Sequence, residues 1–192
     1  MDAQAVLDFW FLPPGDAGHG KVRREWFVKD AAFDAAIRER FGAAITHAIA
    51  GGLREWDEQG PRGVLARILV LDQFTRNAHR DTPDAFAGDV LALAAARELV
   101  DSGAHLQLSP VERQFAYMPF EHAEDAGMQA RAVDLFTELA AGHEGFGEAL
   151  DYAHRHRGVI ARFGRFPHRN PILGRASTPD ELDYLSQPGA GF

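Results

Sequence analysis

A short segment near the C-terminal end of the chain combines side chains that bind anions with one that can transfer a proton. Residues 162–170 read RFGRFPHRN, with three arginines, one histidine and two phenylalanines. Guanidinium groups hold carboxylates and phosphates through paired hydrogen bonds, and an imidazole changes its charge near neutral pH. Pro167 and Pro171 restrict the backbone on either side of His168. The segment is therefore a candidate binding site for a small phosphate or carboxylate compound.

A second polar segment, residues 117–125, contains a proline inside a helical pattern. It reads YMPFEHAED, and Pro119 is expected to kink or break the helix because it lacks the N–H donor and crowds the preceding turn. Carboxylates and a histidine beside such a break could form an acid–base set or a metal site. No HExxH or comparable ligand spacing accompanies them. We therefore favour an electrostatic role, in which Glu121 or Asp125 pairs with the arginines of 162–170.

A third polar segment, residues 71–77, closes a helix that is apolar on most of its circumference. The helix is expected over residues 64–74, and the segment LDQFTRN begins in its last turn and ends at Asn77. Polar groups at the end of a buried helix need water or hydrogen-bond partners. We therefore expect Arg76 and Asn77 to meet water or polar partners.

The three segments are predicted to line one side of the molecule, above Phe163 and Phe166 in the core. Residues 154–175 contain no acid, and a buried guanidinium without a carboxylate costs several kcal/mol. Its cations should therefore approach the acids after Pro119, with Arg165 within about 12 Å of Glu121 or Asp125. The predicted contacts join Arg162, Arg165 and His168 to Glu121, His122 and Asp125.

Two groups of side chains make up this candidate site. The candidates for proton transfer are His122, His156, His168 and Glu121. The candidates for ligand binding are Arg76, Asn77, Arg162, Arg165, Arg169 and Asn170. No metal ligand and no cofactor is predicted. The same residues could equally form a structural network of ion pairs, since such networks also gather charged groups.

The charge of the chain is unevenly distributed. The net charge is −8, yet residues 154–175 hold six arginines and three histidines, and the remainder carries −14. Arginines interleaved with phenylalanines can bind RNA. Because the acidic remainder would repel a phosphate backbone, nucleic-acid binding ranks last among the candidate functions.

The composition and the termini exclude several classes of protein. The chain has no cysteine, so it forms no disulfide or thiolate metal site. No apolar run approaches the ~20 residues needed to cross a bilayer, and residues 1–11 lack the features of a secretory signal. We expect a cytoplasmic protein without membrane contact. The glycine-rich segment 15–21, GDAGHGK, lacks the strand–loop–helix context of a phosphate loop.

The hydrophobic pattern is helical along nearly the whole chain. Apolar residues recur at three- and four-residue spacing over 31–50. Further helices are expected over residues 3–11, 64–74, 129–141 and 146–163, the last one closed by Gly164. No segment alternates as a strand would. We predict one all-α domain over residues 1–192, with seven to nine helices stacked as antiparallel pairs.

Three more helix starts share one local signal. A hydroxyl residue precedes proline at Thr82-Pro83, Ser109-Pro110 and Thr178-Pro179. Glu112 follows Ser109, and Glu181 follows Thr178, at the spacing of a capping box.

Six motifs of this chain resemble the domain-of-unknown-function family 924. They are DFW at 8–10, WF at 26–27, LDQFTRN, YMPFEHAED, RFGRFPHRN and LGRAST at 173–178. The resemblance extends from about residue 6 to residue 185. It identifies His156 as the motif histidine before RFGRFPHRN, and it differs at Thr75, where the family pattern has proline. Without that proline the helix could extend further.

The resemblance implies a TPR-like helical fold and no assigned activity. Our first hypothesis is a polar cleft that binds a small anionic ligand and could act on it. The alternative is a helical module that binds a peptide or protein partner without catalysis, by analogy of fold. Arginines that converge would favour the small ligand, and exposed arginines spread along a groove would favour the peptide.

Overall fold

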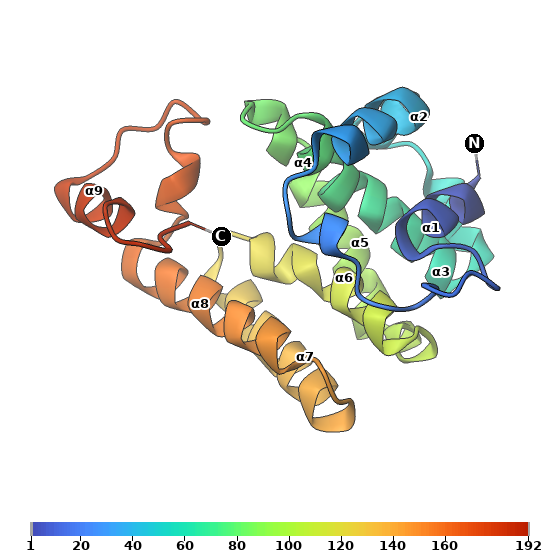
Figure 1. The fold of residues 1–192 in the computed structure, drawn as a ribbon. Coiled ribbons are helices and arrows are strands. Elements are labelled where there is room, and N and C mark those ends of the chain that lie inside the picture. The colour runs from blue at the N-terminus through green and yellow to red at the C-terminus, as the bar shows by residue number, and fades with distance from the viewer. Residues whose placement is uncertain (1, 192) are drawn as a thin grey trace. The chain divides into compact units, whose positions relative to one another are not determined.

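All regular structure in residues 2–191, the part of the chain that the computed structural model describes, is helical (Figure 1). This range contains no strand, which confirms the all-α prediction, and no helix in it is long and apolar enough to cross a membrane. The α-helices are α1 (Ala3–Phe11), α2 (Ala31–Ile49), α3 (Pro61–Ile68), α4 (Thr75–Ala78), α5 (Asp89–Asp101), α6 (Pro110–His122), α7 (Ala126–Gly142), α8 (Gly147–Phe163) and α9 (Pro179–Leu185). A TPR-like stacking of the helices stays a prediction.

The chain forms two compact units, and the boundary between them falls inside one helix. The N-terminal unit comprises Met1–Arg80 and Asp84–Pro119, and the C-terminal unit comprises Asp81–Pro83 and Phe120–Phe192. The change from one unit to the other occurs within α6, directly after Pro119. Because α6 continues to His122, the expectation of a helix break at Pro119 is wrong. One domain over residues 1–192 stays a prediction.

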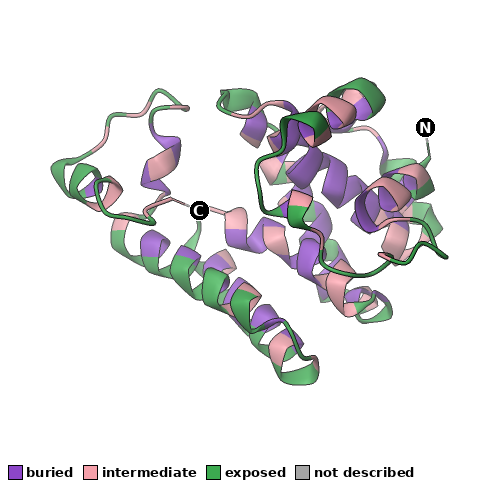
Figure 2. Ribbon diagram, viewed as in Figure 1, coloured by how far each residue is buried: buried purple, intermediate pink, exposed green. Residues whose placement is uncertain are grey.

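Aromatic side chains form the centre of the N-terminal unit. Trp10, Phe41, Phe74 and Phe115 are completely or almost completely buried, and Figure 2 shows which parts of the helices in this unit are buried. The ring centroid of Trp10 lies 5.5 Å from that of Phe74 and 5.4 Å from that of Phe115. The helix that carries Phe74 contacts α1, α2 and α5. It is therefore the central buried helix that the sequence predicts.

This central helix contains one turn of π-helix. α3 ends at Ile68, the π-turn spans Leu69–Phe74, and α4 begins at Thr75. The backbone N–H of Thr75 bonds to the carbonyl of Val70, and the Thr75 hydroxyl donates to the same oxygen at 2.9 Å. The bond spans five residues instead of four, which is the signature of a π-turn. Thr75 thus holds this turn with two donors.

The π-turn packs closely against a glycine, Gly88. A Cβ atom at Gly88 would lie 2.1 Å from the carbonyl oxygen of Leu71. No other residue fits at that distance without a shift of the backbone. Gly88 directly precedes α5, so the missing side chain lets α5 approach the central helix.

Local capping signals set most of the helix ends. The Ser109 N–H donates to Glu112 Oε2 at 2.9 Å, and the Glu112 N–H donates back to Ser109 Oγ at 3.3 Å. Thr178 and Glu181 form the same reciprocal pair at the start of α9. Gly164 ends α8 with a φ of 70°. The remaining signal, Thr82-Pro83, starts only a 3₁₀ turn over Pro83–Phe86.

The C-terminal unit is built on the pair α7 and α8, which lie side by side (Figure 1). The buried residues of α8 follow at three- and four-residue spacing, so they form one face of the helix; they are Ala153, His156, Val159 and Ile160. Phe166 is completely buried against Val159 and Ile160, as predicted, whereas Phe163 is half-buried beside Tyr184. His156 therefore occupies a position in the apolar stripe of α8.

Candidate functional site

Arg165 pairs with Glu181 on α9. Its Nε donates to Glu181 Oε1 at 2.7 Å and its Nη2 donates to Oε2 at 2.8 Å. The hydrogen bonds from Arg165 lower the pKa of Glu181 to about 2, although burial opposes the charge. The sequence had assigned Arg165 to Glu121 or Asp125, so the predicted partner is wrong. The acid that contacts Arg165 is Glu181, the N3 residue of the capping box at the start of α9.

The other residues of that predicted pairing also have different partners. Asp125 caps α7 by accepting from the Met128 N–H at 2.8 Å. The guanidinium of Arg162 is exposed and lies over the Phe163 ring, 4.6 Å from its centroid. Glu121 pairs with His156, as described below. The cations and acids of the two motifs are thus connected differently from the prediction.

Glu124 and Arg175 join the segment after α8 to the end of α6. Arg175 Nη1 donates to Glu124 Oε2 at 2.6 Å, and Nη2 donates to Oε1 at 2.9 Å. The backbone N–H of Phe166 donates to Glu124 Oε1 at 2.8 Å. Burial opposes ionisation of Glu124, but these hydrogen bonds outweigh it and lower its pKa. An acid that follows Pro119 therefore does neutralise an arginine of 154–175.

Asn170 connects the two ion pairs. Its side chain is completely buried, with Nδ2 donating to Glu181 Oε2 at 3.2 Å and Oδ1 accepting from Arg175 Nε at 2.9 Å. Nδ2 also donates to Ser177 Oγ at 3.1 Å. Because these bonds use the whole amide, Asn170 fixes the loop between α8 and α9.

Glu121 orients His156. The Nδ1 atom of His156 lies 2.8 Å from Glu121 Oε1 and 2.9 Å from the carbonyl oxygen of Tyr152. Because a carbonyl only accepts hydrogen bonds, Nδ1 carries the hydrogen. In the neutral ring, Nε2 therefore holds the lone pair and can accept a proton. Both side chains are buried.

Three histidines and one arginine gather near Phe166. The Phe166 ring centroid lies 5.5 Å from the His156 ring, 5.6 Å from the His168 ring and 4.5 Å from the Arg169 guanidinium. The His122 and His156 rings are 6.3 Å apart, and Arg169 Nη2 donates to the His122 carbonyl at 3.1 Å. We call His122, His156, His168 and Arg169, with Phe166, the histidine cluster.

His168 is neutral at physiological pH. Burial, together with the positive charges of Arg169 and Arg175, lowers its pKa to about 4 against the opposing effect of Glu124. The surroundings of this ring therefore disfavour added positive charge. A nearby segment covers part of it, because a Cβ atom at Gly191 would lie 3.3 Å from His168 Cβ.

Residues 6–189 match the family of bacterial proteins of unknown function DUF924. The chain belongs to this family. It is similar to a solved structure, that of the protein of unknown function ATU0120 from Agrobacterium tumefaciens, with 41% sequence identity, a TM-score of 0.81 and 96% of each chain covered. No curated protein matches the chain.

The LDQFTRN motif of this DUF924 protein lies in the N-terminal unit, where acids hold its polar residues. Arg76 Nη1 donates to Asp72 Oδ1 at 2.9 Å and Nη2 donates to Asp89 Oδ2 at 3.0 Å. Burial opposes the charge of Arg76, but the two aspartates outweigh it and raise its pKa. Asn77 Nδ2 donates to Asp34 Oδ1 at 2.8 Å. Both residues thus meet polar partners, as expected.

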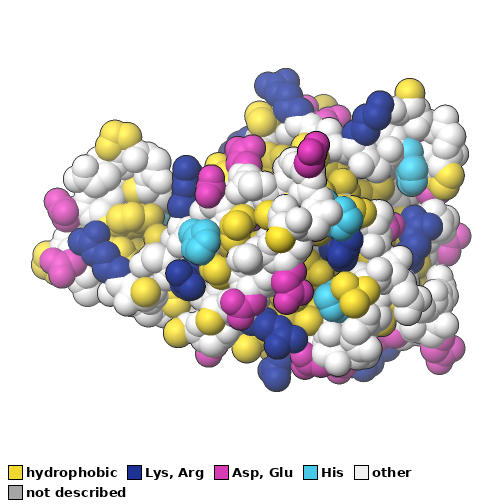
Figure 3. Space-filling view, turned by 90° about the horizontal axis from the view of Figure 1, so that it is seen from below, with side chains coloured by type: hydrophobic (Ala, Val, Ile, Leu, Met, Phe, Trp, Pro, Cys, Tyr) yellow, Lys and Arg dark blue, Asp and Glu magenta, His cyan; other side chains and the backbone are white. Residues whose placement is uncertain are grey.

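Sequence reasoning missed two residues of the C-terminal network. The sequence predicts Glu181 only as part of a capping box, and it includes Arg175 only among the six arginines of residues 154–175. The LGRAST motif at 173–178 was their signal, because it contains Arg175 and ends at Thr178, the N-cap of α9. On the face drawn in Figure 3, basic side chains lie beside acidic ones and do not form a continuous positively charged patch.

Proposed function

We propose that the C-terminal unit of this DUF924 protein binds a small anion, a phosphate or carboxylate compound, at the histidine cluster. The observation that carries the proposal is the grouping of His156, His168 and Arg169 around the ring of Phe166. The Arg169 guanidinium and the N–H of the neutral His168 ring are donors that carboxylates and phosphates accept from, and Nε2 of His156 can accept a proton from the bound compound.

The electrostatics of the cluster support an anion. Burial alone disfavours either sign of charge, but the positive charges of Arg169 and Arg175 act on His168. The field that disfavours a proton on His168 favours a negative charge beside it. A partly buried site also strengthens this attraction, because the effective dielectric constant is lower than in water.

The Glu121–His156 pair adds a proton acceptor to the proposed site. The carboxylate fixes the ring with Nδ1–H toward Glu121 and would stabilise the imidazolium formed when Nε2 takes a proton. This is the arrangement of a general base with an orienting acid. The bound compound, or a water beside it, would be the proton donor.

The remaining arginines act as supports in this proposal. Arg165 and Arg175 each hold a carboxylate of the chain itself, Glu181 and Glu124. With the buried Asn170, they fix the loop that carries His168 and Arg169. Their convergence on one loop favours a small ligand over an extended peptide.

The proposal is tested by titrating the protein with inorganic phosphate and, separately, with acetate while the histidine imidazole NMR signals are recorded. We expect the His156 and His168 signals to shift and to saturate. Arg169→Gln should weaken binding about tenfold or more, the loss of one charged hydrogen bond. Arg155→Gln is the matched control, because Arg155 is exposed on α8 and lies over the Tyr152 ring.

Two results would overturn the proposal. One is a set of imidazole signals that neither anion changes, and the other is an equal response of the Arg155 and Arg169 variants. Should Arg169→Gln not fold, Arg169→Lys keeps the charge but loses the planar group. That variant should still bind, more weakly than the unmodified protein.

A further inference from the structure

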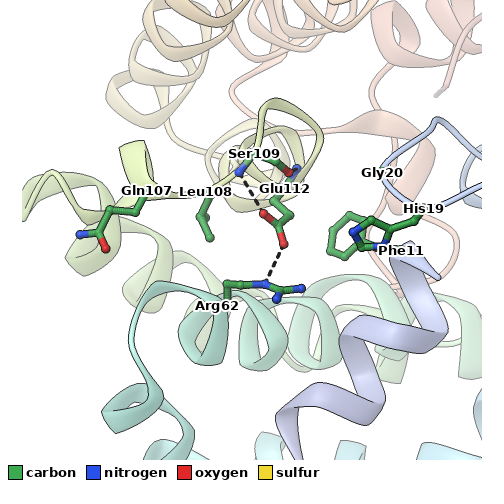
Figure 4. Close-up of a pocket in the computed structure, with 8 residues that line it drawn as sticks. All are labelled: Phe11, His19, Gly20, Arg62, Gln107, Leu108, Ser109 and Glu112. Carbon is green, nitrogen blue, oxygen red and sulfur yellow. Dashed lines mark hydrogen bonds and ion pairs between the residues drawn. The ribbon is translucent and has the colours of Figure 1, made fainter. Parts of the chain in front are cut away.

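The N-terminal unit contains a pocket that is lined by apolar side chains and by one cation (Figure 4). Its volume is about 420 Å³, within the range of small-molecule sites. Phe11 and Leu108, both almost completely buried, are its apolar lining residues. The polar lining includes His19, Arg62 and Glu112.

Arg62 contacts Glu112 through Nε and extends its terminal amino groups past it. Nε donates to Glu112 Oε1 at 3.0 Å, while the Ser109 N–H donates to Oε2 at 2.9 Å. Both oxygens of Glu112 are therefore occupied. The guanidinium end of Arg62 points toward Phe11 and His19 (Figure 4), and its side chain is 43% exposed. These terminal amino groups can therefore donate to a bound molecule.

The glycine-rich segment 15–21 supplies a fixed aromatic wall to this pocket. His19 Nδ1 lies 2.5 Å from the Leu12 carbonyl oxygen, and because a carbonyl only accepts, Nδ1 is the donor. This hydrogen bond holds the imidazole beside Phe11 (Figure 4). The segment that showed no phosphate-loop context thus positions a ring at the pocket.

We infer that this pocket binds a small monocarboxylate with a flat apolar body. Its carboxylate accepts hydrogen bonds from the terminal amino groups of Arg62, in the paired geometry that a guanidinium offers. Its apolar body packs on Phe11 and Leu108, with the His19 ring at one side. The two parts match the two kinds of surface that the pocket presents.

The charge of the pocket limits the ligand to one negative charge. The charges of Arg62 and Glu112 cancel each other. A bound carboxylate is attracted by the guanidinium of Arg62 and lies near the single negative charge of Glu112. A phosphate dianion would bring a second negative charge beside Glu112, which like-charge repulsion disfavours. The site therefore differs from the histidine cluster in disfavouring phosphate, which is one of the anions proposed for that cluster.

The inference is tested by isothermal titration with benzoate, with benzyl alcohol and inorganic phosphate as comparison ligands. Benzoate should bind, benzyl alcohol should bind at least about tenfold more weakly because it lacks the carboxylate, and phosphate should not compete. Arg62→Gln should lower the benzoate affinity about tenfold or more. Arg54→Gln is the matched control, since Arg54 pairs with Glu98 at 3.9 Å on an exposed surface.

The outcome is separate from that of the anion proposed for the C-terminal unit. His168→Gln should leave benzoate binding unchanged, and Arg62→Gln should leave the phosphate response of the histidines unchanged. Arg62→Lys, which keeps the pair with Glu112, serves if the glutamine variant does not fold, and it should also bind benzoate more weakly. Equal binding of benzoate and benzyl alcohol, or an unchanged affinity in both Arg62 variants, would overturn the inference.

Discussion

Arg165 holds Glu181 through two parallel hydrogen bonds, of 2.7 and 2.8 Å, from Nε and Nη2 to the two carboxylate oxygens. The same carboxylate accepts from the Thr178 N–H at 2.7 Å and from Asn170 Nδ2 at 3.2 Å. One buried side chain therefore caps α9, neutralises an arginine and fastens the loop that follows α8. Removing its charge should affect all three contacts together.

Glu181→Gln is expected to destabilise the C-terminal unit by about 2 kcal/mol, the range for hydrogen bonds to a charged group. The glutamine keeps the size of the side chain but can no longer accept two hydrogen bonds from Arg165. Urea denaturation measures the loss. Asp180→Asn is the control, because Asp180 precedes Glu181 on the same helix and is exposed, and an equal loss there would contradict the assigned role.

The stability of the protein should fall in acid in a way that depends on Glu181. Its pKa is about 2 in the folded chain against 4.5 ordinarily, so the unfolded chain binds more protons between these values. The stabilisation is complete above about pH 4.5 and is lost as the pH falls toward 2. Denaturation curves recorded across this window give the free energy of unfolding at each pH, and this free energy should change less with pH in Glu181→Gln. An identical change in both proteins would refute the effect.

His168 should make the protein less stable in mild acid. Its pKa is about 4 in the folded chain against 6.5 ordinarily, so the unfolded chain binds the proton more readily. Its contribution is complete above about pH 6.5 and is lost as the pH falls to about 4. The His168 ring signals, followed by NMR, should have their midpoint near pH 4. His168→Gln should reduce the pH dependence of stability in this window, and His154→Gln, at an exposed position of α8, should not.

Gly88→Ala should destabilise the N-terminal unit by about 1–3 kcal/mol, as overpacking does. The new Cβ atom would lie 2.1 Å from the Leu71 carbonyl oxygen, so the backbone must move. Gly42→Ala is the opposite case, since a Cβ atom there has nothing within 4 Å and Gly42 lies inside α2. That variant should gain roughly 0.5–1 kcal/mol from helix propensity. Chemical denaturation should show that the free energy of unfolding falls in Gly88→Ala and rises in Gly42→Ala. A change of the same sign in both variants would count against the close approach at Gly88.

The sequence predicted those features that depend on neighbours along the chain. The capping pairs Ser109–Glu112 and Thr178–Glu181 are local, and both are found. The helix from Ala3 to Phe11 was predicted with its observed bounds. The break expected at Pro119 does not occur, because α6 tolerates the missing donor and continues to His122.

Partners distant in sequence were harder to predict. Glu181 lies 16 positions after Arg165, and Asp34 lies 43 positions before Asn77. A count of charges shows that 154–175 needs acids from elsewhere, but several acids fit that count equally well. Only the path of the loop after Gly164 decides that Arg165 contacts Glu181 and Arg175 contacts Glu124. The grouping of His156 and His168 near Phe166 depends on the same path.

The extra residue in the π-turn sets the angular phase of the motif that follows it. Successive residues of an α-helix are rotated by about 100° around the axis. If Leu69–Phe74 continued as regular α-helix, Arg76 and Asn77 would be rotated by about that angle from their observed directions. Arg76 would then point away from Asp89, and Asn77 would point away from Asp34. A deletion of one residue within the turn should instead keep the direction of both side chains, because it removes the extra residue and leaves the phase unchanged.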